Sequence, residues 1–240
     1  MPADATRTVV LLRSASGADD AYVRAFEAAG FRARCVPVLA FRFPRQAALR
    51  DCVAQPDRYA GLIATSPRAV RAIEQAGLDE AVRPGWADKP AYAVGPKTAA
   101  ALRALGFAPQ GEEAGHAAAL ASVIATKEKP YLFLCGNRRR DTLPTALREA
   151  GTPYEELIVY ETHPRTAIDL PLPDPGDWLV FFSPSGIDAV AAQSAAVVAA
   201  YRMAAIGPTT AAALRDHGWP PEAVAEAPAP SPLVAALQEA

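Results

Sequence analysis

Residues 95–107 read Gly95-Pro-Lys-Thr-Ala-Ala-Ala-Leu-Arg-Ala-Leu-Gly-Phe107, and residues 207–219 read Gly207-Pro-Thr-Thr-Ala-Ala-Ala-Leu-Arg-Asp-His-Gly-Trp219. Extended by two residues, to Pro109 and Pro221, the two stretches share ten identities in fifteen positions. Each copy follows a Ser-Pro step further upstream. The repeat therefore predicts a chain built from two related halves, and a pair of similar lobes predicts a ligand held between them.

Short apolar runs rich in branched residues recur along the chain, and most of them lead into a pattern typical of a helix. This alternation predicts an α/β fold in which each lobe is a parallel sheet flanked by helices. Ser66-Pro67 and Ser183-Pro184 mark helix starts, because a capping serine precedes proline at the first helical position. The expected strands are residues 9–12, 35–39, 62–64, 92–94, 131–134, 157–160, 179–182 and 203–206.

A second, weaker repeat relates residues 9–39 to residues 131–160. Along the chain, copies of the weak repeat therefore alternate with copies of the strong one, in the order weak, strong, weak, strong. Each lobe could consist of one weak copy and the strong copy that follows it. Alternatively, the first weak copy and the last strong copy could form one lobe, with the two middle copies inserted as the other. Proline-rich stretches at residues 36–44 and 163–175 flank that middle block and favour the insertion. The expected lobes are residues 1–38 plus 170–240, and residues 41–165.

Composition and missing motifs exclude several classes of protein. The formal charge of −2 comes from 24 basic and 26 acidic residues, which argues against a nucleic-acid surface. Cys35, Cys52 and Cys135 are interpreted as reduced and buried, without a disulfide framework or zinc site. Neither a secretory segment in residues 1–8 nor a membrane span is expected, so the predicted location is the cytoplasm. The dinucleotide, Walker, serine-hydrolase and zinc-protease motifs are missing from the sequence.

Ligands of parallel α/β sheets bind beyond the carboxyl ends of the strands, so residues just after each apolar run are candidates for a site. Several stand at expected helix N-termini, where free N–H groups and the helix dipole favour an anion by roughly 0.3 to 1 kcal/mol each. Carboxylates or phosphates are therefore the expected ligands. The candidates are Arg13, Ser14, Thr65, Ser66, Arg68, Gly95, Lys97, Thr98, Gly136, Asn137, Arg138, Tyr160, Thr162, Ser183, Ser185, Gly207, Thr209 and Thr210.

Many of these positions also have a purely structural interpretation. Capping of a helix is by itself enough to explain Ser66 and Ser183. For Thr98 and Thr210, a structural role is favoured for either residue alone, and their duplication makes ligand contact an equal alternative. The three histidines lie far apart in the sequence, and none is expected to act as a ligand or base.

The charged and aromatic candidates are equally open to two interpretations. The turn at residues 136–140 is either a solvated loop or a binding site. In the second case the guanidinium of Arg138 donates two parallel hydrogen bonds to one carboxylate. Arg13 ends an apolar run, where a charge needs a partner. Tyr160 is either a half-buried aromatic or a proton donor to a leaving group, since a phenol is protonated at neutral pH.

Six motifs follow one another between Leu62 and Ala211. They are Leu62-Ile-Ala-Thr-Ser-Pro-Arg-Ala-Val70, Val94-Gly-Pro-Lys-Thr98, Leu134-Cys-Gly-Asn-Arg138, Val159-Tyr-Glu-Thr162, Phe181-Phe-Ser-Pro-Ser-Gly186 and Ala205-Ile-Gly-Pro-Thr-Thr-Ala211. In this order they resemble the uroporphyrinogen-III synthase family. The resemblance implies two α/β lobes, the first discontinuous, joined by two connecting segments with the active site in a cleft between them.

The resemblance also implies an activity. Enzymes of this family cyclise hydroxymethylbilane, a linear tetrapyrrole with eight carboxylates, to uroporphyrinogen III, with loss of water and inversion of ring D. The expected protein needs no cofactor or metal, acts as a monomer in haem, chlorophyll or cobalamin synthesis, and contacts neighbouring pathway enzymes transiently. Carried over residue by residue, the resemblance makes Tyr160 the proton donor and assigns to substrate binding Arg13, Ser66, Gly95, Thr98, Gly136, Asn137, Arg138, Ser183, Gly207 and Thr210.

Two other functions stay open at this point. A two-lobed tetrapyrrole or polycarboxylate sensor could use the same helix ends to hold a ligand without converting it. Product analysis with freshly generated hydroxymethylbilane separates that protein from the enzyme. A two-domain enzyme acting on a phosphate ligand is the other alternative, and the missing glycine-rich phosphate loop disfavours it.

Overall fold

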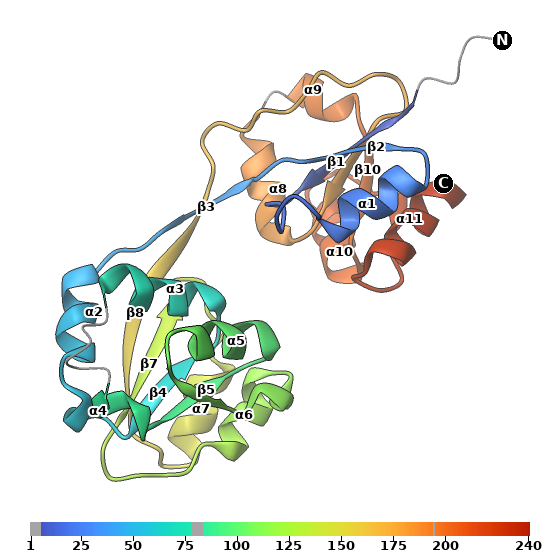
Figure 1. Ribbon diagram of the computed structural model, residues 1–240. Coiled ribbons are helices and arrows are strands. Elements are labelled where there is room, and N and C mark those ends of the chain that lie inside the picture. The colour runs from blue at the N-terminus through green and yellow to red at the C-terminus, as the bar shows by residue number, and fades with distance from the viewer. Residues whose placement is uncertain (1–5, 78–83, 194) are drawn as a thin grey trace. The chain divides into compact units, whose positions relative to one another are not determined.

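The computed structural model of the protein describes residues 6–77, 84–193 and 195–240. Contacts between Cα atoms divide the chain into two compact units, whose elements are labelled in Figure 1. Unit 1 consists of the chain up to Ala40 together with His163–Ala240, and unit 2 is Phe41–Thr162. Residues 1–5, part of the stretch in which no secretory segment is expected, lie outside the described residues.

Unit 1 contains a five-stranded sheet in the order β11-β10-β9-β1-β2, in which all neighbours are parallel. Its strands are β1 (Thr8–Leu12), β2 (Arg32–Cys35), β9 (Trp178–Phe181), β10 (Arg202–Ala205) and β11 (Ala223–Val224). Its helices are α1 (Ala21–Ala28), α8 (Pro184–Ala191), α9 (Ala195–Ala199), α10 (Pro208–Asp216) and α11 (Pro230–Glu239).

Unit 2 contains a six-stranded sheet in the order β3-β8-β7-β4-β5-β6. Its strands are β3 (Leu39–Arg42), β4 (Gly61–Ala64), β5 (Pro90–Ala93), β6 (Ala108–Gln110), β7 (Tyr131–Gly136) and β8 (Tyr154–Pro164). Its helices are α2 (Gln46–Val53), α3 (Pro67–Ala76), α4 (Pro84–Ala87), α5 (Pro96–Ala104), α6 (Ala117–Val123) and α7 (Thr142–Glu149), with 3₁₀ turns at Pro56–Arg58 and Glu112–Ala114.

Each sheet has apolar residues on both faces because helices cover both. In unit 1, Val10 and Leu179 belong to the apolar cluster under α8 and α10, while their neighbours Val9 and Trp178 belong to the cluster under α1 and α11. Unit 2 divides in the same way, with α2, α3 and α5 on one face and α6 and α7 on the other. Burial on both faces explains why the central strands show no alternation of apolar and polar residues. The predicted α/β fold is confirmed.

The two sheets have matching strand orders. The order β11-β10-β9-β1-β2 of unit 1 corresponds to β6-β5-β4-β7-β8 of unit 2. The strong repeat forms α10 and α5, which occupy the same place in this order, and the weak repeat forms β1-α1-β2 and β7-α7-β8. Unit 1 therefore combines segments from the two ends of the chain, and the chain passes between the units within β3, after Ala40, and near the end of β8, after Thr162 (Figure 1).

Two short edge strands were not expected, and one expected strand is wrong. Residues 35–39 do not form one strand, because β2 ends at Cys35 and β3 begins at Leu39. Pro37 lies between them and has no N–H to donate to a sheet. The edge strands β6 and β11 were not expected because neither contains an apolar run, and β6 has Pro109 at its centre.

The cysteines are free thiols, two of them as buried as expected. Cys52 and Cys135 are buried, but Cys35 is only half-buried because β2 is an edge strand of its sheet. Burial raises the pKa of the Cys135 thiol to about 12, so this group is unreactive at neutral pH. Among the described helices, none has the length and apolar character needed to cross a membrane.

Candidate functional site

The predicted site residues lie where the parallel strands of each sheet end, an edge called here the carboxyl edge. In unit 1, β1 ends just before Arg13, β9 ends two residues before Ser183, and β10 ends two residues before Gly207. Parallel strands end on the same side, so these residues share one edge of their sheet. Unit 2 repeats the arrangement, and its carboxyl edge carries Ser66, Gly95, Thr98, Gly136, Asn137, Arg138 and Tyr160.

The two Ser-Pro helix starts are not equivalent. Both helices begin at the expected proline, α3 at Pro67 and α8 at Pro184. The Ser66 hydroxyl accepts a hydrogen bond from the backbone N–H of Arg68 at 3.2 Å, so Ser66 caps its helix. Ser183 occupies the same N-cap position but makes no capping hydrogen bond. The hydroxyl of Ser183 is therefore the more available of the two for a ligand.

Gly95 and Gly207 occupy the N-cap positions of α5 and α10, and they differ in conformation. Gly95 has φ of +78°, a region that favours glycine. Gly207 has φ of 171° and ψ of 177°, an extended backbone that any residue adopts. A Cβ atom added at Gly207 would meet nothing within 4 Å. The fold therefore explains the first glycine and leaves the second unexplained.

Thr98 and Thr210 do not cap their helices, because glycine holds both capping positions. They lie at the third helical position, and only 2% of Thr98 and 4% of Thr210 is exposed. The capping interpretation of these threonines is wrong. Each is a buried polar residue in the first turn of a helix at the carboxyl edge of its own unit.

Tyr160, Gly136 and Asn137 form one cluster in unit 2. The register of β7 and β8 shifts between Cys135 and Gly136, which sets Gly136 opposite Tyr160. A Cβ atom at Gly136 would lie 2.4 Å from Cζ of Tyr160, so only glycine leaves room for this ring. The N–H of Asn137 donates to the Tyr160 carbonyl at 3.1 Å, and Oδ1 of Asn137 accepts from the N–H of Thr162 at 2.9 Å. Backbone contacts on both sides thus fix the half-buried Tyr160 ring.

Arg68 lies beside this cluster, although the family resemblance does not assign it to the site. Its guanidinium stacks over the Phe41 ring, with 3.8 Å from Cζ to the ring centroid. Partial desolvation lowers the pKa of Arg68, and interaction with Tyr160 offsets part of that shift. The sequence offers one signal for this role, the position of Arg68 directly after Ser66-Pro67.

Two arginines of the turn after β7 differ in their contacts. Arg139 pairs with Asp141 and, at 2.8 Å, with Glu156. These hydrogen bonds, that of Glu156 above all, raise the pKa of Arg139. Arg138 is exposed and forms no ion pair with any residue that the structure describes. Of these two arginines, Arg138 is therefore the one able to meet a carboxylate.

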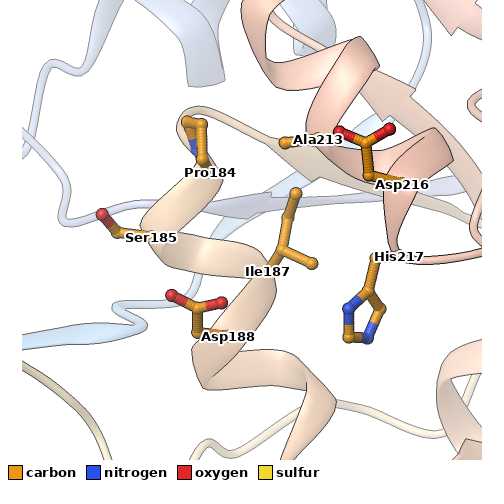
Figure 2. Close-up of a pocket in the computed structure, with 7 residues that line it drawn as sticks. All are labelled: Pro184, Ser185, Ile187, Asp188, Ala213, Asp216 and His217. Atoms are coloured by element: carbon orange, nitrogen blue, oxygen red, sulfur yellow. The ribbon is translucent and has the colours of Figure 1, made fainter.

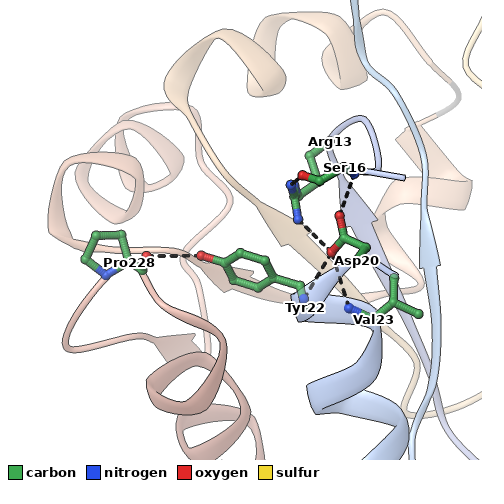
Figure 3. Close-up of polar contacts among 6 residues, drawn as sticks. All are labelled: Arg13, Ser16, Asp20, Tyr22, Val23 and Pro228. Carbon is green, nitrogen blue, oxygen red and sulfur yellow. Dashed lines mark hydrogen bonds and ion pairs between the residues drawn. The ribbon is translucent and has the colours of Figure 1, made fainter. Parts of the chain in front are cut away.

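Arg13 has the partner that its position requires. Its guanidinium donates to Oδ1 of Asp20 and to Oγ of Ser16, both at 2.9 Å (Figure 3). It also lies over the rings of Tyr22 and Phe182, at 4.8 and 5.3 Å from their centroids. Asp20 in turn caps α1. Contacts within unit 1 thus account for the placement of Arg13 without a ligand.

Asp20 is the polar centre of this network, and it was not among the residues predicted for the site. Only 2% of the residue is exposed. Its carboxylate accepts hydrogen bonds from the N–H of Ser16 at 2.7 Å and from that of Tyr22 at 3.0 Å (Figure 3). Burial alone would raise the pKa of Asp20, but these hydrogen bonds and the charge of Arg13 lower it on balance. Asp20 is therefore ionised at neutral pH.

One hollow of unit 1 lies between α8 and α10 and has a volume of about 320 Å³ (Figure 2). Two carboxylates, those of Asp188 and Asp216, line it together with His217. The ring of His217 packs against Trp219, with 4.4 Å between the centroids. Two negative charges disfavour an anionic ligand, so this hollow does not suit a polycarboxylate. Among the described residues, no group of three histidine, cysteine, aspartate or glutamate side chains could hold a metal ion.

Comparison with known proteins gives one consistent family. The model of the family described as Uroporphyrinogen-III synthase HemD matches residues 20–235. A uroporphyrinogen-III synthase of Schizosaccharomyces pombe is 33% identical to this chain over 248 residues, 96% of each chain. That of Saccharomyces cerevisiae is 30% identical over 208 residues, 74% of each chain.

Solved structures show the same fold. The crystal structure of uroporphyrinogen-III synthetase from Helicobacter pylori matches with a TM-score of 0.67 at 22% identity, covering 98% of this chain and 99% of that chain. A mutant uroporphyrinogen III synthase from Thermus thermophilus matches with a TM-score of 0.56 at 24% identity, covering 98% of this chain and 97% of that chain.

Proposed function

The chain belongs to the uroporphyrinogen-III synthase family, and from this premise we propose how its residues bind and convert the substrate. It is a cyclising lyase of tetrapyrrole biosynthesis. The reaction closes linear hydroxymethylbilane to uroporphyrinogen III, with loss of water and inversion of ring D. The observation that carries this conclusion is the family match, which extends over residues 20–235 and so includes strands and helices of both sheets.

The substrate's carboxylates bind at the helix N-termini of the carboxyl edges. Four helices, α3, α5, α8 and α10, begin there with proline at the first position. Their first-turn N–H groups have no acceptor within the helix and carry the positive end of the helix dipole. With a formal net charge of only −2, the protein neither attracts nor repels a polyanion strongly as a whole, so local donors must hold it.

Side chains add charge to these backbone donors in unit 2. Arg138 provides an exposed guanidinium that can meet a carboxylate as a fork. Arg68, stacked on Phe41, provides a second one next to Tyr160. Arg13 contributes indirectly. Its donors are occupied by Asp20 and Ser16, and these hydrogen bonds order the chain after β1.

Tyr160 donates the proton that removes the substrate hydroxyl as water. Loss of water leaves an azafulvene cation at the terminal carbon, which bonds to the substituted carbon of ring D. The resulting spiro intermediate reopens and closes with the ring inverted, and the proton lost from the pyrrole carbon balances the one donated. The contacts of Tyr160 with Gly136 and Asn137 support this role, because a general acid must be held in place. Hydroxymethylbilane also closes unaided without inversion, so the main task of the protein is to hold a conformation of the substrate.

We also propose the organisation that the sequence predicts. The two lobes are residues 1–38 plus 170–240 and residues 41–165. The division of contacts after Ala40 and after Thr162 supports a discontinuous first lobe around an inserted second one, and it groups residues 163–165 with the first. The protein works in the cytoplasm as a monomer without a cofactor. Its three free thiols support the cytoplasmic location, where thiols stay reduced. Transient contacts with neighbouring enzymes of the pathway belong to the same proposal.

Product analysis tests the proposed reaction. We expect incubation with freshly generated hydroxymethylbilane to give the type III isomer, separated chromatographically from the type I isomer that forms without inversion. A protein that binds the tetrapyrrole without converting it would give the same type I product as buffer alone. That outcome would replace the enzyme by a binding module.

The two capping glycines provide a test of substrate contact. Gly95→Ala should lower the free energy of unfolding by about 1 to 2 kcal/mol, because φ of +78° strains alanine. Gly207→Ala should change it by less than about 0.5 kcal/mol, since its backbone is extended and no atom lies within 4 Å of the new methyl group.

Activity measures substrate contact at Gly207 separately from stability. Because the substrate approaches the backbone at the N-terminus of α10, the methyl group of Gly207→Ala should lower kcat/KM at least tenfold, about 1.4 kcal/mol of transition-state binding. Urea denaturation and steady-state kinetics on both variants measure the two effects. Full activity of Gly207→Ala would remove this glycine from the substrate site.

A further inference from the structure

Unit 2 has a hollow of its own, on the side of its sheet that is opposite the carboxyl edge. The parallel strands begin on this side, which is called here the amino edge. The volume of the hollow is about 390 Å³, and its lining is Tyr59, Ala60, Lys89, Lys127, Glu128 and Lys129. These residues immediately precede β4, β5 and β7, which are neighbours in the sheet. Strands of four to six residues separate the hollow from the carboxyl edge by about 13 to 20 Å. It is therefore not part of the site described above.

Lysines gather at this hollow. The chain contains only four lysines among its 24 basic residues, and the fourth, Lys97, lies at the carboxyl edge. Lys89 enters the hollow from the loop before β5, while Lys127 and Lys129 enter from the loop before β7. Three cations from two loops thus surround one space, and Glu128 is the single acidic residue in its lining, which leaves a formal charge of +2.

The ammonium groups are held but not neutralised. Lys89 donates to the Tyr59 carbonyl at 3.0 Å, and Lys129 donates to the Asp57 carbonyl at 2.6 Å. In the described part of the chain, no carboxylate forms an ion pair with any of the three lysines. Lys127 is exposed and contacts neither a carbonyl nor a carboxylate there, so capping of carbonyl groups does not explain its presence.

We propose that this amino-edge hollow, lined by Lys89, Lys127 and Lys129, binds a small multivalent oxyanion that carries phosphate or carboxylate groups. An ammonium on a flexible stem supplies three donors that rotate to suit the anion, which is how lysine binds phosphate as a point charge. The hollow has the volume of a small-molecule site. Two of the cations are already fixed by backbone carbonyls, so binding costs little additional side-chain entropy.

Lysine NMR tests the proposal directly, because the four lysines give only four ammonium signals. The intact protein, labelled with ¹³C and ¹⁵N in lysine, is titrated with inorganic phosphate and separately with citrate at constant ionic strength. We expect the signals of Lys89, Lys127 and Lys129 to shift with one common Kd for at least one of the two anions. Saturation with phosphate alone identifies a phosphate site, and saturation with citrate alone a polycarboxylate site. Shifts that stay linear in the anion concentration, or that differ in Kd among the three lysines, would overturn the proposal.

Two neighbouring exposed residues give a matched pair of variants. Lys127→Gln removes one positive charge and should weaken anion binding about fivefold, while Glu128→Gln removes one negative charge and should tighten it by a similar factor. Both side chains are exposed, so the fold tolerates both changes. If Kd moves in the same direction in both variants, or in neither, the anion does not bind among these lysines.

Discussion

Replacing Tyr160 by phenylalanine should lower the rate of uroporphyrinogen III formation about a hundredfold, because general acid catalysis typically contributes at least that factor. The ring stays in place without the hydroxyl, since Gly136 packs against it and the N–H of Asn137 bonds to the Tyr160 carbonyl. The free energy of unfolding should therefore change by less than about 1 kcal/mol. Stopped assays with hydroxymethylbilane, with both isomers quantified, measure the effect.

Two further variants make this prediction specific. Tyr154→Phe removes a hydroxyl from the same strand, six residues away, and should leave the rate unchanged. Gly136→Ala should lower the rate as far as Tyr160→Phe does, because the added Cβ would lie 2.4 Å from Cζ of Tyr160 and must displace the ring. Normal turnover by Tyr160→Phe would remove Tyr160 as the acid, and normal turnover by Gly136→Ala would show that the position of the ring does not matter.

Asp20→Ala should lower the free energy of unfolding by about 3 kcal/mol. The change removes an N-cap, worth about 1 kcal/mol, and leaves the mostly buried Arg13 without its ion pair. Urea denaturation measures the loss. Asp19→Ala is the matched control, because the neighbouring pair of Asp19 with Arg24 is largely exposed and should contribute less than about 1 kcal/mol.

The Asp20 network also predicts a pH dependence. The pKa of Asp20 is lower in the folded protein than its ordinary value of 3.8, so its ionisation stabilises the fold above that pH. That contribution is lost as the pH falls below 3.8 and through the lower folded value. Asp20→Asn keeps a capping oxygen without the charge. The difference in unfolding free energy between the wild type and Asp20→Asn should therefore shrink with acid, and a constant difference would contradict the assignment.

Much of the fold follows from local signals in the sequence. The repeat predicted α5 and α10, and proline after serine predicted the starts of α3 and α8, because each depends on residues adjacent in the chain. The interruption at Pro37 was missed although proline is itself a local signal, whereas the edge strands β6 and β11 could not be found from local signals. Their pairing comes from the neighbouring strand rather than from their own apolar residues.

The site shows the same limit. The carboxyl-edge positions follow from the strand pattern, but the contacts that fix Tyr160 depend on a one-residue register shift between β7 and β8. Asp20 lies seven residues from Arg13, across a loop whose conformation no local pattern specifies. The amino-edge lysines meet only because the sheet order places β7, β4 and β5 side by side.

Residue-resolved amide hydrogen exchange with bound uroporphyrinogen III tests most directly whether helix N-termini at the carboxyl edges hold the carboxylates. The amides of Lys97, Ser185 and Thr209, each at the second helical position, have no acceptor within their helices. We predict that saturating product under anaerobic conditions slows exchange at these amides at least tenfold, and leaves the exposed Leu172 unchanged. Equal exchange rates at all three amides with and without product would contradict the proposed binding mode.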